Sequence, residues 1–425
     1  MQRDTFLNRS YSNWHSHLVN LTAVFCLLPF IAPLPISTDV QYPVFFLCAF
    51  IFMLDVFSGY VRLSKIDLYF IFISLLSFIY ISPFIDAPYE LHKRVGLISS
   101  FFVYYVFTRY AYFVKAKAIL LAIYINFVAV IFNVINPSLF SSMAGYITRI
   151  VKISHLDGPR GVSGLAPEPG FMGAMSIVFI LIIFLLYKQN KVSRHKAISV
   201  TILSVLVAIA TSSGTASLML LTLATLVLIF ANIRVSGKLL LLILGFLLYI
   251  LYSLSYSPNS RGLKILVYLM TDPSKIFFSD ASVGFRMIAI LVGFESIIQG
   301  NLFGHGVGSL SVVAKDIASN GMIEYLFPHV FYRVGANLSA FSQYTVEMGL
   351  FFWILIAWIY FKSISNSFSL IVRIMTLFFL IASFSILFPP LWLLIGFTDV
   401  RNKFLYAENN DQHQPKKKKS KVRQS

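Results

Sequence analysis

The sequence predicts an all-α integral membrane protein that crosses the bilayer in about twelve helices and carries two large loops on the outer side. Of its 425 residues, 58% are hydrophobic and only 12% are charged, with a mean hydropathy of +0.79. Apolar runs long enough to cross a bilayer recur along the chain. Basic residues gather in alternate connections between these runs, which is typical of cytoplasmic loops.

The predicted helices follow the apolar runs in order: 18–36, 40–57, 66–85, 95–114, 118–135, 171–187, 197–211, 216–231, 239–254 and 341–361. A final run, 374–397, contains Pro389 and Pro390. Proline interrupts a helix, and an even number of spans is needed if both termini lie on one side. We therefore expect two short helices with a turn near the prolines.

Charge assigns the orientation. Arg3 and Arg9 precede the first run, and the tail contains Lys416 to Lys419, so both termini are expected in the cytoplasm. The net charge of +17 follows from this bias, and with no soluble domain left we expect no nucleic-acid partner. Residues 1–401 form the predicted membrane domain, and 402–425 a disordered basic tail resting on anionic lipid.

The first outer loop, 136–170, ends in a charged and glycine-rich segment that cannot span a membrane as a helix. It holds Arg160 and Glu168, preceded by Arg149 and Lys152. Arginine presents a planar fork of donors that matches phosphate oxygens. The segment is thus a candidate anion site, or else a turn that re-enters the membrane with Arg160 paired to Glu168.

The second outer loop, 255–340, contains a predicted amphipathic helix at 285–298 that begins with Arg286 and is followed by the turn GHGVG, which includes His305. This helix either binds a ligand or lies flat on the bilayer. Farther on, His329 and Arg333 stand four residues apart and share a helical face. A lone histidine is more often structural than catalytic.

Two carboxylates complete the candidates. Glu347 lies near the outer end of a predicted helix, where it either meets substrate, snorkels or bonds to a neighbouring helix. Asp55 is expected to be solvated at the inner surface. Neither a phosphate-binding Walker loop, zinc-ligand spacing, a nucleophile elbow nor an Asp-rich magnesium pair occurs in the sequence. Cys26 and Cys48 lie in apolar runs, so a thiolate site is not expected either. The sequence thus predicts no metal and no cofactor.

The motifs together resemble the O-antigen polymerase (Wzy-type) group within the O-antigen polymerase and ligase family of bacteria. The resemblance rests on R-G-x-x-G-x-x-x-E-P-G at 160–170, S-S-G-T at 212–215 and F-R…G-x-G-x-G from 285 to 308. The E-x-G at 347–349 and the proline-broken final pair also fit. It covers most of the chain.

The resemblance implies a glycosyltransferase that polymerises undecaprenyl-pyrophosphate-linked oligosaccharides at the periplasmic face of the inner membrane. The product would be O-antigen or a related surface polysaccharide of lipopolysaccharide biosynthesis. A chain-length regulator is an implied partner. Essential arginines of the group match Arg160 and Arg286, although the R-x10-G spacing of some members is missing here.

The remaining roles follow from the chemistry of a pyrophosphate leaving group, which needs positive charge, and of an attacking hydroxyl, which needs a base. Glu168 is the first candidate base and His329 the second. The resemblance also gives Arg149, Arg261 and Arg333 as secondary candidates. Together with Lys152, His305 and Glu347 they form the candidate substrate-binding residues.

Three alternatives stay open. The related O-antigen ligases usually place a His-Asn pair before the E-x-G, where this chain has Leu338 and Ser339. A flippase or other transporter is disfavoured by the absence of internal repeats. A membrane scaffold would leave Arg160 and Arg286 without a purpose.

Overall fold

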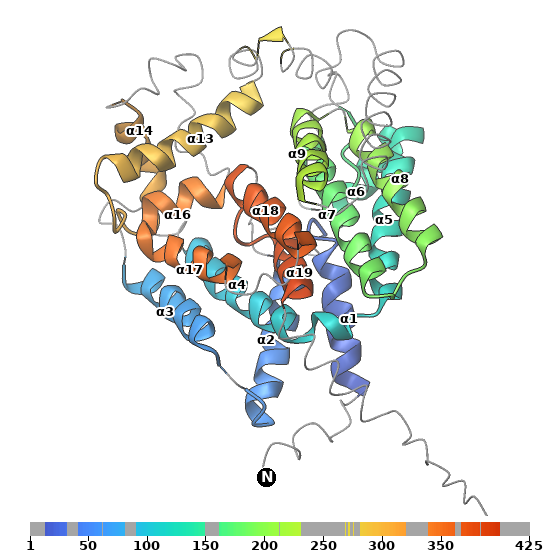
Figure 1. The fold of residues 1–425 in the computed structure, drawn as a ribbon, viewed down its shortest axis with the longest axis horizontal. Helices are drawn as coiled ribbons and strands as arrows, with labels where there is room; N and C mark the ends of the chain where they lie inside the picture. The colour runs from blue at the N-terminus through green and yellow to red at the C-terminus, as the bar shows by residue number, and fades with distance from the viewer. Residues whose placement is uncertain are drawn as a thin grey trace, which may run out of the picture.

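The structure is a computed structural model that describes residues 13–31, 41–61, 63–80, 91–148, 161–211, 213–230, 268, 271–272, 275, 281–319, 339–361, 367–382 and 384–399. This part of the chain is predominantly helical (Figure 1), and it contains an isolated β-bridge between Ile31 and Thr148. The predicted all-α class is confirmed.

Most helices overlap the predicted runs. Up to residue 147 the helices are α1 (Asn13–Cys26), α2 (Tyr42–Phe57), α3 (Lys65–Ile79), α4 (Leu91–Tyr110), the short 3-10 helix η2 (Ala111–Phe113), α5 (Ala116–Ile135) and α6 (Pro137–Ile147). The helices that follow are α7 (Pro169–Lys188), α8 (Arg194–Ala210), α9 (Gly214–Phe230), α13 (Ala281–Ile298), α14 (Leu310–Ser319), α16 (Ala340–Met348), α17 (Leu350–Phe361), α18 (Ser367–Ala382) and α19 (Pro389–Thr398). However, α1 ends at Cys26 within the run 18–36, and α6 and α14 lie in segments predicted as outer loops.

Two of the described helices, α5 and α7, are long and apolar enough to cross a membrane. Other apolar helices, such as α2, α9 and α17, have between 10 and 17 residues. The predicted count of about twelve spans is therefore not confirmed. The predicted helix at 239–254 lies outside the described residues.

Another predicted helix is divided in two. The run 341–361 forms two helices, α16 and α17, which meet at Gly349. Gly349 has φ +54, and a Cβ at this position would lie 2.1 Å from the carbonyl oxygen of Leu302. The backbone of another segment thus forces the break, a contact that periodicity cannot reveal. The final run is split as predicted, with α19 starting at Pro389.

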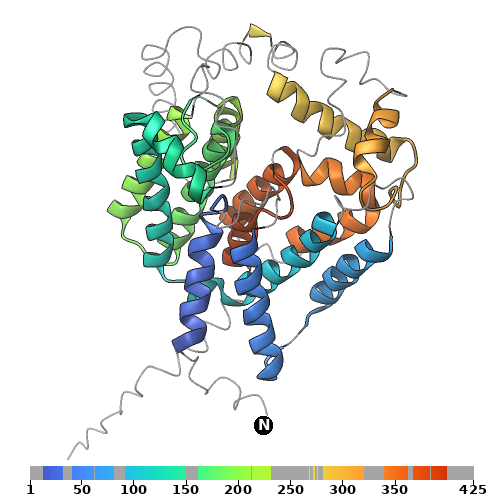
Figure 2. The same ribbon diagram turned by 180° about the vertical axis from the view of Figure 1, so that it is seen from behind.

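The helices form two groups around a central set. Figures 1 and 2 show α5 to α9 on one side of α1, α18 and α19, and α3, α13, α14, α16 and α17 on the other. The central packing includes Trp392 of α19, whose ring centroid lies 5.7 Å from that of Phe70 and 5.6 Å from that of Tyr104. These buried rings join α19 to α3 and α4.

The surface of the outer helices is unusually apolar. Large side chains are exposed on several of them, including Phe46 and Phe57 of α2, Phe72 of α3 and Val128 of α5. Soluble monomers rarely expose such extended apolar surface. This surface is typical of helices that face lipid or a partner.

Asp55 is buried, contrary to the expectation of a solvated residue, with 1% of its surface exposed. Its carboxylate accepts hydrogen bonds from Tyr105 Oη at 3.0 Å and Tyr110 Oη at 2.7 Å. Its other oxygen lies 3.2 Å from His15 Nε2. Hydrogen bonds from two helices replace the lost water, which makes burial of the charge tolerable.

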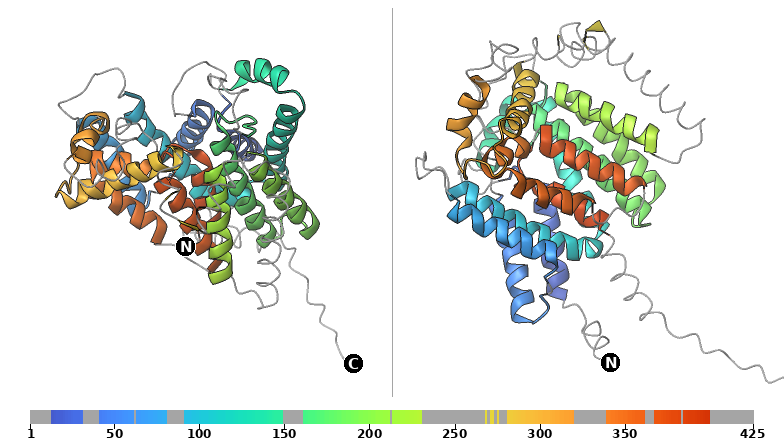
Figure 3. Two further views of the ribbon diagram at one scale, coloured as in Figure 1. Left: turned by 90° about the horizontal axis from the view of Figure 1, so that it is seen from above. Right: turned by 60° about the vertical axis from the view of Figure 1, so that its left-hand side comes forward.

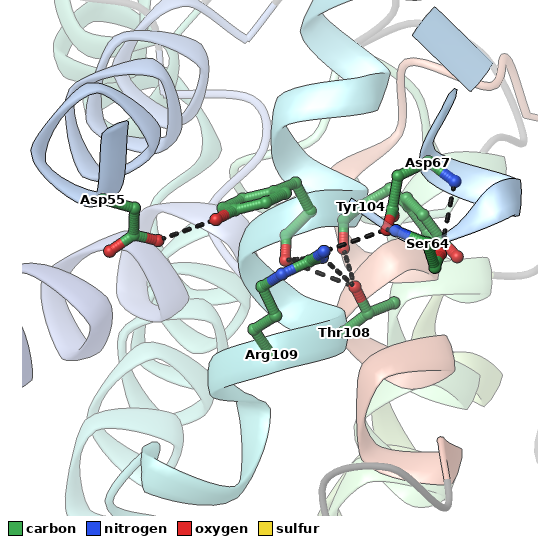
Figure 4. Close-up of polar contacts among 7 residues, drawn as sticks. Asp55, Ser64, Asp67, Tyr104, Thr108 and Arg109 are labelled. Atoms are coloured by element: carbon green, nitrogen blue, oxygen red, sulfur yellow. Dashed lines mark hydrogen bonds and ion pairs between the residues drawn. The ribbon is translucent and has the colours of Figure 1, made fainter. Parts of the chain in front are cut away.

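A second buried carboxylate extends this network, as Figure 4 shows. Asp67 closes a capping box with Ser64 at the start of α3 and accepts a hydrogen bond from Arg109 Nη2 at 2.9 Å. The Arg109 guanidinium also stacks on the Tyr105 ring at 3.8 Å. The network therefore ties α1, α2, α3 and α4 together at one end.

Candidate functional site

Arg286 brings two of the sequence motifs together. Its Nη1 donates a hydrogen bond to Thr215 Oγ1 in the S-S-G-T turn. A Cβ placed on Gly170, the end of the E-P-G motif, would lie 3.6 Å from Arg286 Nη2 and 3.5 Å from Ser213 Oγ. We call Gly170, Ser213, Thr215 and Arg286 the arginine junction. It joins α13, from one side of the molecule, to α7 and α9 on the other.

The arginine junction is electropositive because two helix N-termini add to the charge of Arg286. α7 begins at Pro169 and α9 at Gly214, so the first turns of two helices meet Arg286. The first N–H groups of a helix lack intrahelical partners, and its N-terminal end carries partial positive charge. Arg286 is half-buried, so its charge is felt in a medium less polar than water. The arrangement suits an anion that has several oxygens, such as a phosphate.

Glu168 lies beside the junction. It is the N-cap residue of α7, two positions before Gly170, and its exposed side chain makes no capping hydrogen bond. A carboxylate in this place is available to accept a proton from a bound hydroxyl.

The segment after Arg160 is fixed in place by three backbone donors. Val162 N donates to Ala210 O at 3.1 Å. Ser163 N and Gly164 N both donate to Asn133 Oδ1 of α5, at 3.3 Å and 3.2 Å. The segment is thereby held between the end of α8 and the last turns of α5, close to the start of α9. Arg160 itself lies outside the described residues.

The backbone amides of the GHGVG turn form hydrogen bonds within the protein. His305 N donates to Val346 O at 2.8 Å and Gly306 N to Glu347 O at 3.0 Å, so both cap the end of α16. Val307 N donates to Tyr80 O at 3.0 Å. Three successive amides are therefore taken by the protein itself, and the turn does not offer them to a phosphate.

His305 and Glu347 belong to this turn. Glu347 is fully buried and accepts a hydrogen bond from Gln343 Nε2 at 3.2 Å. His305 Nε2 is buried without a hydrogen-bond partner, and burial lowers the pKa of its imidazole. The structure thus separates the described candidates into Arg286 and Glu168 at the junction, and His305 and Glu347 at the glycine turn.

Several candidates fall outside the described residues: Arg149, Lys152, Arg160, Arg261, His329 and Arg333. The structure in turn adds Ser213, Thr215 and Asn133, which the sequence did not single out as site residues. Polar residues at a helix start and an asparagine inside an apolar run were the available signals.

Comparison with known proteins yields no family assignment: no protein-family model matches the chain, and no curated protein matches its sequence.

Proposed function

We propose that the protein is a polytopic inner-membrane glycosyltransferase that polymerises undecaprenyl-pyrophosphate-linked oligosaccharide repeat units. The observation that carries the proposal is that Arg286 forms a hydrogen bond with the S-S-G-T turn and lies beside Gly170 of the E-P-G motif. These three motifs support the resemblance to O-antigen polymerases, and they lie far apart in the sequence. One residue of each motif, namely Gly170, Thr215 and Arg286, lies at the arginine junction, and this supports a shared site.

The chemistry of such a site starts at the donor. Cleavage of the bond between the anomeric carbon and the phosphate oxygen leaves the electron pair on undecaprenyl pyrophosphate. Arg286 and the two helix ends would stabilise that growing negative charge, an effect worth about 10²–10³ in rate for one well-placed donor. Arg160 would supply a second fork from the neighbouring segment.

The acceptor supplies the nucleophile. A sugar hydroxyl at the non-reducing end of the next repeat unit attacks the anomeric carbon, and its proton passes to a base. Glu168 is the proposed base, because its carboxylate is exposed and lies two residues from Gly170. The products are the lengthened lipid-linked chain and undecaprenyl pyrophosphate.

The membrane setting is part of the same proposal. The long apolar helices α5 and α7 and the exposed apolar side chains of α2 and α3 support it. Both termini are placed in the cytoplasm, with the segments 136–170 and 255–340 in the periplasm. Reporter fusions at Gly158, Asp280 and Ser425 test this orientation, and a periplasmic Ser425 contradicts it.

A deletion strain tests the function. We expect surface polysaccharide with core carrying a single repeat unit and no ladder on a gel. Loss of a ligase would instead give bare core with lipid-linked polymer accumulating, and loss of a flippase would trap single units on the cytoplasmic side. An intact ladder in the deletion strain contradicts the proposal.

A further inference from the structure

We propose that α6 is an interfacial helix that lies in the headgroup region of the outer leaflet and rests on lipid through an apolar stripe. The stripe consists of Leu139, Met143, Tyr146 and Ile147. This inference rests on the membrane setting of the proposed function and is independent of the polymerase chemistry.

The helix has three distinct faces. Phe140 and Ala144 are buried, and the Phe140 ring lies 5.7 Å from that of Phe132 in α5. The stripe residues share a second face by their spacing, and all are exposed, Tyr146 to 89%. Ser138 and Ser142 are exposed on the third face. A helix that presents one side to protein, one apolar side and one polar side is suited to a membrane surface.

The position of α6 follows from α5. A helix of 20 residues is about 30 Å long, which matches the hydrocarbon thickness of a bilayer. Asn136 ends α5 and caps α6 by accepting a hydrogen bond from Leu139 N, and Pro137 occupies the first turn. The left panel of Figure 3 shows α6, in blue-green, turned across the end of α5. A helix across the end of a spanning helix lies in the plane of the membrane surface.

Lipid is the occupant that the chemistry favours. The exposed apolar surface of α5 runs through Val128, Ile131 and Val134 to Ile135 and continues directly into the stripe. The sequence has no charged residue between Lys117 and Arg149. The stripe is thus an extension of the proposed lipid-facing surface of α5 and has no charge to orient a polar partner.

This arrangement would set the depth of the arginine junction. Asn133, which holds Ser163 and Gly164, lies one turn before α6 on α5. The segment that leads to Glu168 is therefore attached at the level of the headgroups. That is the depth at which the pyrophosphate of a lipid-linked substrate resides.

Site-specific fluorescence in vesicles tests the inference. Single cysteines at Met143, Ser142 and Val128 are labelled with NBD in full-length protein reconstituted in phosphatidylcholine and phosphatidylglycerol. Cys26 and Cys48 are buried, so unsubstituted protein serves as the blank. Quenching is measured with nitroxide lipids, labelled near the carbonyl or near the chain end, and with aqueous iodide.

We expect the probe at Met143 to emit at shorter wavelength than the probe at Ser142 and to be quenched by the shallow nitroxide. The adjacent probe at Ser142 should be quenched by iodide instead, and the probe at Val128 by the deep nitroxide. A Met143 probe that iodide reaches as easily as Ser142 overturns the inference, and so does one that neither quencher reaches, because a protein partner would then cover the stripe. Tyr146→Cys replaces Met143→Cys if the latter does not fold. Failure of lipid quenching at Val128 instead refutes the membrane setting.

Discussion

The guanidinium of Arg286 donates a hydrogen bond to the hydroxyl of Thr215, 71 residues earlier in the chain. This bond fixes the direction of a cation that lies next to Gly170 at the start of α7. A guanidinium carries its N–H donors in a rigid fork, so a hydrogen bond at one nitrogen sets the orientation of the whole group. Thr215 therefore acts as a positioning residue for Arg286.

The first prediction concerns this bond. Thr215→Val keeps the shape of the side chain and removes the acceptor, so we expect polymerisation to fall by up to about 10²-fold, the effect of misplacing a group by about 1 Å. Thr215→Ser should retain most activity. Initial rates of chain growth with purified protein measure the effect.

A matched control lies on the same helix. Thr222 donates to Leu218 O, within α9, and takes no part in the junction. Thr222→Val should leave the rate close to that of the wild type. Equal losses in Thr215→Val and Thr222→Val would indicate a general effect on α9 and would contradict the positioning role.

The second prediction concerns the buried pair of Asp67 and Arg109. Arg109→Met leaves the Asp67 carboxylate buried without its cation, a change that typically costs about 3–5 kcal/mol. We expect a large drop in melting temperature in detergent. Replacing both residues, as Asp67→Leu with Arg109→Met, should restore much of the melting temperature.

The exposed pair of Lys275 and Asp272, with Nζ and Oδ2 3.6 Å apart, is the control. Lys275→Met should change the free energy of unfolding by less than about 1 kcal/mol. A melting temperature that is unchanged in Arg109→Met would show that the network does not hold the four helices together.

The third prediction separates backbone conformation from packing. Gly300 and Gly304 both have positive φ, +83 and +78. A Cβ on Gly304 would lie 2.5 Å from the carbonyl carbon of Glu347, whereas nothing lies within 4 Å of one on Gly300. In both alanine variants the positive φ should lower the free energy of unfolding by about 1–2 kcal/mol. In Gly304→Ala the close contact should lower it by about 1–3 kcal/mol more. Similar melting temperatures for the two variants would refute the close contact with α16.

The fourth prediction concerns pH. Burial lowers the pKa of His305, so the folded protein resists a proton that the unfolded chain accepts below about pH 6.5. The difference in bound protons makes stability fall as pH falls through that range. His305→Gln should flatten this part of the melting-temperature profile. An unchanged profile in His305→Gln would assign the pH dependence to other groups.

Much of the fold could be predicted from local pattern. Apolar runs and prolines predicted the positions of most helices, because the signal for a helix depends on residues that are close in the sequence. Gly349 could not be interpreted as a helix break, since the cause is the carbonyl of Leu302, which lies far away in the sequence. The prediction that Asp55 is solvated was wrong for a similar reason, because the tyrosines that donate hydrogen bonds to its carboxylate come from another helix.

The candidate site was predicted in part. Residue chemistry identified Glu168, since charged groups between apolar runs stand out, and the resemblance to O-antigen polymerases added Arg286. The motif S-S-G-T was noted without a role, and only the fold brings Thr215 to Arg286. The glycine turn was the opposite case: a pattern open to a ligand role serves to cap α16.

The central claim is that Arg286 stabilises the departing pyrophosphate of a lipid-linked donor, and one reconstituted reaction tests it most directly. Purified wild-type protein and Arg286→Ala, at equal amounts and with matching melting curves, are incubated in vesicles with undecaprenyl-pyrophosphate-linked repeat units and EDTA. We expect longer lipid-linked chains and released undecaprenyl pyrophosphate with the wild type, and rates lower by about 10²–10³-fold with the variant. Equal chain growth by the two proteins, or growth that stops with EDTA and returns with magnesium, would contradict it.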